Sequence, residues 1–416
     1  MNSTTLSQPR ITEQLELLSP AGDMERLRMA VLYGADAVYL AGHRFGMRTA
    51  EVCFSDADLQ RGVQFAHAHG VKVYVTCNTL PREDELAELP GYLEFLQEAG
   101  VDALIIADLG VMALAKRHAP QVSLHVSTQF GVLNSAAANA LYDLGADTVV
   151  LARETPLADI RKIRQNTPKE LRLEAFVHGA MCVSFSGRCL LSNYMTGRDA
   201  NRGQCAQPCR WKYHLVEETR PGQYFEITED GGTYIMNSRD LCMIEHIPEL
   251  IDAGISSFKI EGRTKSAYYT AVATNAYRHA IDAALRGEKP DPAWIEETEM
   301  ISHRPYTTGF FYGEPGQHYE EGMFLRKAKV VALVEDCAED GSALLTQRNK
   351  FSVGDRLELL APGMKPLAFT AEGMTDDEGN PITDTRRAMM RFHMKLPVSA
   401  PNGAIVRKRV ETAEIS

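Results

Sequence analysis

The chain has 416 residues, which is enough for one large domain and a smaller one. Its apolar share of 44% and charged share of 24% are typical of globular proteins. No apolar run approaches the roughly 20 residues that a membrane-spanning helix needs, and the first ten residues lack the apolar centre of a signal peptide. We therefore expect a cytoplasmic protein with no membrane contact, whose eight cysteines are reduced thiols rather than disulfides.

The formal net charge of −11 excludes a basic field over the whole protein that would attract nucleic acid. RNA could therefore bind only at a local basic patch. From Arg188 to Lys212, five basic residues stand against the single acid Asp199, a net charge of +4. This stretch could contact phosphates, and Trp211 or Tyr213 could stack on an exposed base. Surface arginines and a core tryptophan would explain the same pattern equally well.

Short apolar runs alternate with stretches of helical periodicity over the first 265 residues. The phrase Gly-Ala-Asp-Ala-Val-Tyr at 34–39 recurs in related form at 100–105, 145–150 and 254–259. In each phrase, the glycine suits the left-handed end of a helix, and the apolar run after it predicts a parallel strand buried on both faces. About nine strands are predicted in this way: 15–19, 34–39, 71–77, 100–105, 122–128, 145–150, 171–177, 233–237 and 254–259.

Eight such strands close a (β/α) barrel, and we expect a TIM-like barrel over residues 12–322, preceded by a disordered tail at 1–11. The alternative is an open doubly wound sheet, which is disfavoured because no Gly-rich dinucleotide fingerprint follows the first strand. The polar, Gly-rich stretch 198–232 predicts a long loop insertion. From 323 to 416 the pattern changes to a small C-terminal β-barrel domain. Its predicted strands are 328–335, 342–345, 355–360, 390–396 and 404–408.

Four cysteines lie close together in the sequence, with the spacing Cys182-x6-Cys189-x15-Cys205-x3-Cys209. They directly follow the strand predicted at 171–177, at the end of a barrel where enzymes of this fold carry their chemistry. Four thiolates can hold a four-iron four-sulfur cluster. Structural zinc is an alternative, but its cysteine pairs usually enclose two to four residues. Buried apolar thiols are the third interpretation.

Cys242 is a fifth candidate ligand, because it follows the strand predicted at 233–237. It could replace Cys209 as the fourth ligand, or it could be a core residue of a helix predicted at 241–251. We favour Cys209.

The cysteine region resembles a known family, the collagenase-like peptidases of family U32. The family signature is a Glu, a Phe two residues on, Gly-small-aliphatic-Cys, four residues and Gly-x-Cys-x-aliphatic-Ser. This sequence matches it at every position, from Glu174 through Phe176, Gly179, Cys182, Gly187 and Cys189 to Ser192. The resemblance extends over nearly the whole chain, including residues 16–22, 34–39, 125–129, 205–211 and 259–263.

The most similar subgroup of the family is concerned with tRNA hydroxylation, on the basis of residues 198–201 and 205–211 and the C-terminal β domain that begins near residue 324. The resemblance implies a barrel with an iron–sulfur cluster that forms 5-hydroxyuridine at the wobble position of tRNA. It implies prephenate as the source of the hydroxyl group, without molecular oxygen. Related members act on ribosomal RNA or in ubiquinone hydroxylation, and the older peptidase label has no assigned mechanism. The expected partners are tRNA, prephenate, and a second copy or a paralogue.

Three further residues are candidate catalytic groups. Arg153 and Arg263 follow predicted strands and could bind the carboxylates of prephenate, although ion pairs with Glu154 or Glu261 would explain them as well. His178, beside the cysteine loop, could donate to the substrate or the cluster. The same histidine with Cys182 or Cys189 would make a thiol protease, but four clustered cysteines exceed what one nucleophile needs.

Overall fold

The computed structural model describes residues 15–46, 53–182, 184–185, 187–211, 215–216, 224–225, 238–316 and 325–410. Eight parallel strands pair in order around a ring, and β11 pairs with both β7 and β1, so the ring is closed. These strands are β1 (Glu16–Pro20), β2 (Ala37–Leu40), β3 (Lys72–Cys77), β4 (Ala103–Ile106), β5 (Ser123–Val126), β6 (Thr148–Val150), β7 (Arg172–Ala180) and β11 (Ser257–Ile260). The predicted (β/α) barrel and eight of its predicted strands are confirmed. The strand predicted at 233–237, the tail at 1–11 and the domain start at 323 lie outside the described residues.

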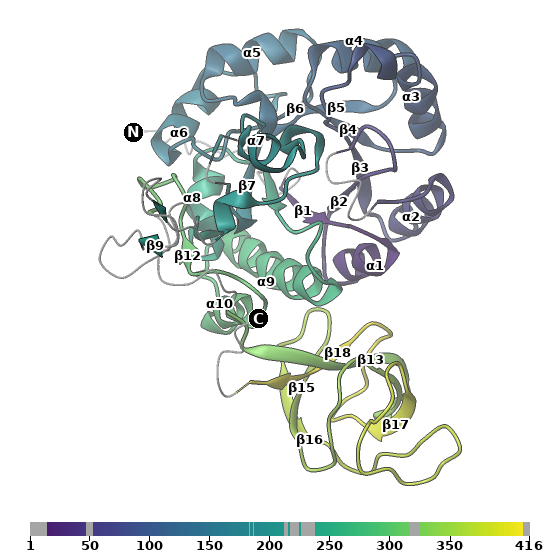
Figure 1. Cartoon of the computed structure of the whole chain (residues 1–416). Helices are drawn as coiled ribbons and strands as arrows, with labels where there is room; N and C mark the ends of the chain where they lie inside the picture. Colours follow the sequence, from purple (N-terminus) through teal and green to yellow (C-terminus); the bar gives the residue numbers. More distant parts are fainter. Residues whose placement is uncertain are drawn as a thin grey trace, which may run out of the picture.

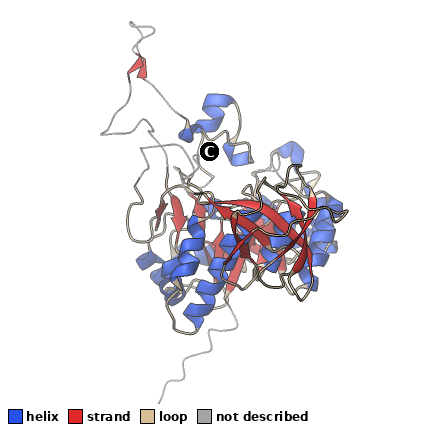
Figure 2. Ribbon diagram, turned by 90° about the horizontal axis from the view of Figure 1, so that it is seen from below, coloured by secondary structure: helices blue, strands red, loops and turns tan. Residues whose placement is uncertain are grey.

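The barrel helices lie outside the strands (Figures 1 and 2). They are α1 (Met24–Leu32), α2 (Asp56–Ala68), α3 (Leu89–Glu98), α4 (Leu109–His118), α5 (Ser135–Asp143), α6 (Leu157–Gln165), α8 (Ile247–Asp252) and α9 (Ala267–Leu285). The side chains of Asp23, Ser55, Asp108, Asn134 and Ser266 accept backbone N–H bonds at helix starts. The glycines of the repeated phrase all have positive φ, for example 101° at Gly34, as the predicted helix ends require. None of the described helices combines the length and apolar character needed to cross a membrane.

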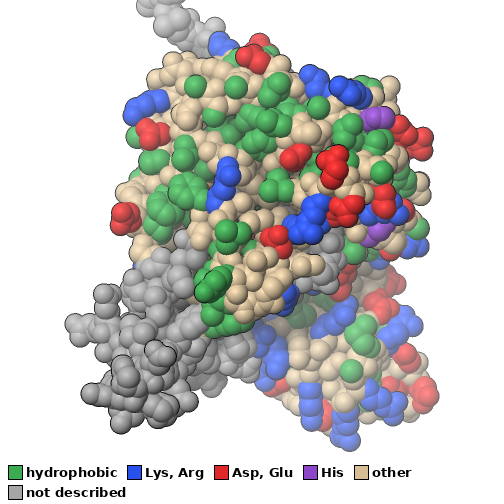
Figure 3. All heavy atoms as spheres, turned by 45° about the horizontal axis from the view of Figure 1, so that its top comes forward, with side chains coloured by type: hydrophobic (Ala, Val, Ile, Leu, Met, Phe, Trp, Pro, Cys, Tyr) green, Lys and Arg blue, Asp and Glu red, His purple; other side chains and the backbone are tan. Residues whose placement is uncertain are grey.

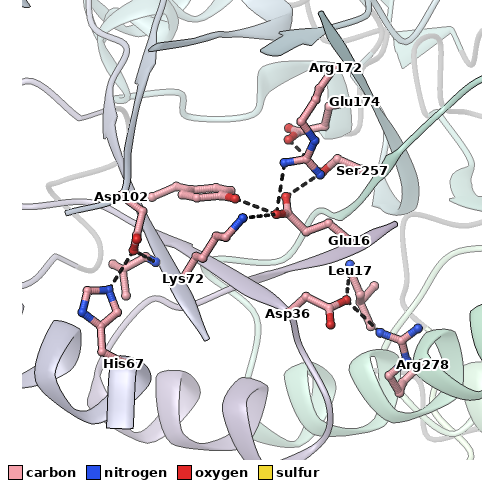
Figure 4. Close-up of polar contacts among 12 residues, drawn as sticks. Glu16, Leu17, Asp36, His67, Lys72, Asp102, Arg172, Glu174, Ser257 and Arg278 are labelled. Carbon is pink, nitrogen blue, oxygen red and sulfur yellow. Dashed lines mark hydrogen bonds and ion pairs between the residues drawn. The ribbon is translucent and has the colours of Figure 1, made fainter. Parts of the chain in front are cut away.

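The barrel interior contains a connected polar network (Figure 4). Glu16 Oε2 accepts hydrogen bonds from the Tyr74 hydroxyl at 2.6 Å and Arg172 Nη1 at 3.2 Å. The Ser257 hydroxyl lies 3.1 Å from both Glu16 Oε1 and Glu174 Oε2. Glu174 in turn accepts from Lys259 Nζ at 2.7 Å. The network therefore links the N-terminal end of the barrel to Lys259, which lies nearer the other end.

Strand β7 is longer than its neighbours, and its end is covered by later parts of the chain. β10 (Asp240–Cys242) pairs antiparallel with residues 178–180, and β12 (Tyr306–Thr307) pairs with β10. α10 (Pro292–Glu299) packs on α9. These elements close the side of the barrel that faces the C-terminal domain.

The C-terminal domain is an antiparallel sheet with the strand order β16-β15-β18-β13-β14-β17. Its strands are β13 (Ala328–Cys337), β14 (Ser342–Gln347), β15 (Arg356–Leu360), β16 (Leu367–Thr370), β17 (Arg391–Lys395) and β18 (Ile405–Arg409). Five of the six match predicted strands. β16 was not predicted; it is only four residues long, pairs only with β15, and none of its residues is buried. The domain packs on the barrel: Leu360 and Ile405 belong to the barrel core, and the Tyr33 hydroxyl donates to Leu360 O at 3.1 Å.

Candidate functional site

A cavity of about 210 Å³ lies at the C-terminal ends of the barrel strands. Residues 182–211, called the cysteine segment below, cover it with the short helix α7 (Leu191–Thr196) and two 3-10 turns at Ala200–Arg202 and Pro208–Arg210. Figure 1 shows α7 over the centre of the strand ring. Arg202 anchors the segment: Nη1 donates to Leu80 O at 2.9 Å and to Glu85 Oε2 at 3.0 Å, both beyond the end of β3. These contacts tie the segment to the loop after β3 at one interior point, Arg202.

All four clustered cysteines line this one cavity, as the spacing predicts. Burial raises the pKa of the Cys209 thiol, the nearby Arg210 lowers it, and Cys182, Cys205 and Cys189 each raise it further. The four thiols are therefore close enough to influence one another electrostatically. The backbone N–H of Gln207 donates to Cys205 Sγ at 3.4 Å, as backbone amides do around iron–sulfur clusters.

Four thiols at one cavity are a donor set that both structural zinc and an iron–sulfur cluster can use. Among the described residues, no three or more His, Cys, Asp or Glu side chains converge at the spacing that one ion requires. Tetrahedral zinc would bring four sulfurs to about 2.3 Å from one centre. In an iron–sulfur cluster each thiolate binds its own iron, so the sulfurs stand farther apart. The four residues that could hold such a cluster are Cys182, Cys189, Cys205 and Cys209.

Cys242 lies elsewhere. It belongs to β10, not to a helix as the alternative proposed, and its thiol approaches the hydroxyls of Tyr277 at 3.7 Å and Thr298 at 4.0 Å. Both partners are on the outer helices α9 and α10. The structure thus groups Cys209, and not Cys242, with the other three cysteines.

Arg153, predicted as a substrate ligand, lines the cavity. Its Nη2 pairs with Glu261 Oε2 at 2.9 Å, its Nη1 donates to Ala180 O at 2.8 Å, and its guanidinium carbon lies 3.9 Å from the centre of the Phe176 ring. The ion pair expected with Glu154 or Glu261 is formed with Glu261. These contacts fix the guanidinium plane against the cavity wall.

Arg263 also lines the cavity, where its Nη1 donates to Thr76 Oγ1 at 3.1 Å. Lys259, four residues earlier, lines the same wall and pairs with the fully buried Glu174. Lys259 therefore reaches the cavity from the end of β11, and Glu261 and Arg263 reach it from the loop after β11. The cavity wall and the residues that pair with it therefore carry three cations and two carboxylates: Arg153, Lys259 and Arg263, with Glu174 and Glu261.

The structure does not bring His178 to the cavity. Phe176 pairs with Lys259, but the next pair is His178 with Ile260, so Val177 is an extra residue in a β-bulge. The bulge turns His178 away from the cavity, among the rings of Tyr269, Tyr277 and Tyr306 at 5.3–5.8 Å. Burial lowers the pKa of His178 to about 3. No histidine is among the described residues that line the cavity, so the disfavoured alternative, a pairing of His178 with a cysteine nucleophile, is not formed.

A polar wall that was not predicted faces the cysteines. Asn78 Nδ2 donates to Gln129 Oε1 at 2.7 Å, and the Ser127 hydroxyl donates to the same oxygen at 3.1 Å. All three residues line the cavity, as does Lys259. Each lies in or directly after a predicted strand, at the barrel end that carries catalysis, and this position is the signal that could have identified them.

The outer surface of the cysteine segment exposes apolar and aromatic side chains. Tyr194 is 90% exposed and Trp211 is 41% exposed, so Trp211 is not the core residue that the alternative proposed. Phe185, Leu190 and Met195 are exposed beside them. Within the basic stretch, Arg202 forms an ion pair with Glu85. Lys212 and the following Tyr213 lie outside the described residues.

Comparisons with known proteins agree with this arrangement. A model of peptidase family U32 matches residues 22–321, and a model of the U32 C-terminal domain matches residues 326–407. The chain is 39% identical to tRNA hydroxylation protein P1 of Bacillus subtilis, with 96% of each chain covered. It is 38% identical to tRNA hydroxylation protein P of Escherichia coli, over 88% of this chain and 90% of the relative. A 23S rRNA 5-hydroxycytidine synthase of Escherichia coli is 38% identical over 73% of this chain and 46% of its own length. The chain therefore belongs to peptidase family U32, with both its barrel and its C-terminal domain.

Proposed function

We propose that this protein hydroxylates C5 of the wobble uridine of tRNA, using a four-iron four-sulfur cluster and prephenate. The observation that carries the proposal is the joint position of four cysteines, two arginines and a lysine around one cavity at the barrel mouth. Relatives that match nearly the whole chain are named for tRNA hydroxylation, and a more distant one for hydroxylation of a ribosomal base. Both kinds of relative support an RNA base as the substrate.

The surface of the cysteine segment suits a single-stranded RNA loop. Such loops are recognised by aromatic side chains that stack on unpaired bases. Tyr194 and Trp211 offer exposed rings on the segment that covers the cavity. A base stacked there would lie next to the cavity, and one extruded base would enter it. The mixed polar wall of Asn78, Ser127 and Gln129 supplies donors and acceptors for the edge of a pyrimidine.

Prephenate carries two carboxylates, and the cavity supplies cations that match them. Arg153 and Arg263 have planar guanidinium groups that can each bind a carboxylate through two N–H bonds. Arg153 is held flat by Glu261 and Phe176, and Arg263 by Thr76, so both are fixed before a substrate arrives. Pre-fixed donors lose little side-chain entropy on binding.

Prephenate can lose its hydroxyl group and carbon dioxide to become aromatic phenylpyruvate, and we therefore propose it as the source of the C5 oxygen. The cluster, when bound, would supply one-electron transfer or Lewis acidity. The chain itself orients the two substrates, with the arginines holding the dicarboxylate, and the cysteine segment covers the cavity and excludes water.

The direct test is mass spectrometry of digested tRNA. A strain without this gene and any paralogue is expected to lack hydroxylated wobble uridine, and the wild-type gene should restore it. The Cys189→Ser variant should not restore it, whereas Cys337→Ser, in the C-terminal domain, should. Unchanged hydroxyuridine in the deletion strain would refute the tRNA assignment.

A peptidase activity is the alternative that the family description raises. It predicts that anaerobically purified protein cleaves gelatin and that Cys182→Ala abolishes the cleavage. We expect no cleavage above that of the Cys182→Ala control, because His178 faces away from the cavity.

A further inference from the structure

A second and larger cavity, of about 570 Å³, lies between the barrel and the C-terminal domain. On the barrel side it is bounded by the loop after β11 and the first residues of α9. On the other side it is bounded by residues 326–330 at the start of β13 and by Asn349. It exists only because the two domains pack together. The site described above does not use it.

The charge of this cavity is opposite to that of the protein. Four cations line it, Arg210, Lys265, Arg326 and Lys329, whereas the whole chain has a net charge of −11. The one carboxylate among its described lining residues is Glu261, which is already paired with Arg153. Surplus positive charge around a concave surface favours an anion.

Lys265 is a partly buried member of this cationic set. Burial is the main reason that its pKa is lowered to about 8; Asp240 and Glu261 raise the pKa, and Arg210 and Arg304 lower it. An anion placed among these groups would stabilise the charged lysine. The Lys265 ammonium donates to Ser302 O at 3.2 Å, which holds it at the cavity edge.

The two cavities are neighbours. Glu261 lines both, and the turn from Gln207 to Arg210 runs between them, with Pro208 and Cys209 on the first cavity and Gln207 and Arg210 on the second. A ligand that spans this wall would have a base on the cysteine side and an anionic group on the cationic side. A nucleotide within an RNA strand has this shape.

We propose that the second cavity binds backbone phosphate of the substrate RNA, next to the nucleotide that enters the cysteine cavity. This inference rests on the proposed function and extends it, because it gives the C-terminal domain a part in holding RNA. The volume admits more than one phosphate, and the inter-domain position leaves a path for a continuous strand. Figure 3 shows Lys and Arg side chains interspersed with Asp and Glu on the faint C-terminal domain at the lower right.

The test compares a cavity variant with a charge-matched control. Arg326→Gln/Lys329→Gln removes two cations from the cavity, and Lys350→Gln/Lys395→Gln removes two from the same domain outside it. The affinity for tRNA is measured by fluorescence anisotropy at several salt concentrations. The cavity variant should bind roughly tenfold more weakly at low salt, and its plot of log K against log salt should be shallower by about 1 to 2. The control should stay close to wild type.

Each outcome discriminates. Equal affinity and salt slope for the cavity variant and the control would overturn the proposal. The proposal would also be overturned if the cavity variant bound tRNA as wild type does but no longer bound inorganic phosphate. The cavity would then be a site for a small anion. Iron content and the thermal midpoint show whether each variant is folded. If the double variant does not fold, Lys329→Gln alone replaces it, and we expect about half the effect. If wild-type protein hydroxylates no tRNA but the cavity variant still binds RNA more weakly, the proposed reaction falls and this site stands.

Discussion

Arg407 in β18 binds both carboxylate oxygens of Glu297 in α10, at 2.7 and 2.6 Å, and thereby joins the C-terminal domain to the barrel. The arginine is completely buried, and it also donates to Glu358 at 2.8 Å and to the Tyr268 hydroxyl at 3.0 Å. Removing one member of a buried ion pair leaves the other charge without compensation. This cluster fixes the relative position of the two domains and so the shape of the inter-domain cavity.

We therefore expect Arg407→Met to lower the free energy of unfolding by about 3–5 kcal/mol. The matched control is Arg409→Met, two residues on, whose half-exposed side chain pairs with Glu296 and Glu358. That change should cost about 1 kcal/mol or less. Differential scanning calorimetry would compare them, and equal losses would contradict a special role for the buried pair.

Cys209→Ser and Cys242→Ser should differ in iron content. Cys209 faces the other three cysteines, whereas Cys242 faces Tyr277 and Thr298. After anaerobic purification, Cys209→Ser should hold much less iron and lose visible absorption, and Cys242→Ser should keep both. Iron loss in Cys242→Ser alone, at wild-type thermal stability, would reverse the assignment of the fourth ligand.

Arg153→Lys keeps the positive charge but loses the planar guanidinium that contacts Glu261, Ala180 and Phe176. We expect kcat/KM for tRNA hydroxylation to fall by about tenfold or more, because an ammonium cannot replace a bidentate, stacked group. Arg161→Lys, an exposed residue of α6 paired with Asp252, is the control and should have no effect. Wild-type kcat/KM in Arg153→Lys would remove Arg153 from the site.

Because His178 is buried, the stability of the folded protein should depend on pH. Burial lowers its pKa from the ordinary 6.5 to about 3, so between these values the unfolded chain binds a proton that the folded chain does not. Stability should therefore fall as the pH drops from about 6.5 towards 3, by up to about 1.4 kcal/mol per pH unit. His178→Phe keeps an aromatic ring among the three tyrosines and should flatten this dependence. Thermal midpoints measured across pH 4–7 would show it, and parallel curves for both proteins would contradict it.

Gly179 tests the close approach of β7 to the loop after β11. It has φ of 106°, and a Cβ there would lie 2.4 Å from the backbone oxygen of Glu261. Gly197 also has positive φ, at 69°, but a Cβ there would meet nothing within 4 Å. Gly197→Ala should cost about 1–2 kcal/mol for its backbone alone. Gly179→Ala should cost more and should weaken hydroxylation by displacing Glu261; equal costs would show that the contact relaxes freely.

The barrel could be predicted from the sequence because its strands are apolar runs, which burial on both faces imposes, and four of them follow a glycine of the repeated phrase. Cys182, Cys189, Cys205 and Cys209 could be grouped because they are near in sequence and unusual in number. Lys259, Asn78 and Gln129 were not identified, since their convergence depends on which strand ends meet around the ring. Their position at predicted strand ends was a local signal, but which strand ends meet across the ring has none.

His178 was misplaced for a different reason. Strict alternation from Glu174 and Phe176 puts residue 178 inside the barrel, and only the bulge at Val177 turns it outward. The bulge is stabilised by backbone contacts from distant elements: Val177 O accepts from the Tyr277 hydroxyl at 2.7 Å and from Met243 N at 2.9 Å. A bulge set by such contacts is invisible to a two-residue period.

Because Val177 is an extra residue in the strand, the number of residues between Glu174 and Cys182 decides where their side chains point. Shortening the strand by that one residue would return the histidine to the inner side, move Gly179 out of its contact with Glu261, and draw the first cysteine back by one step. We therefore expect deletion of a single residue between Glu174 and Cys182 to disrupt the site.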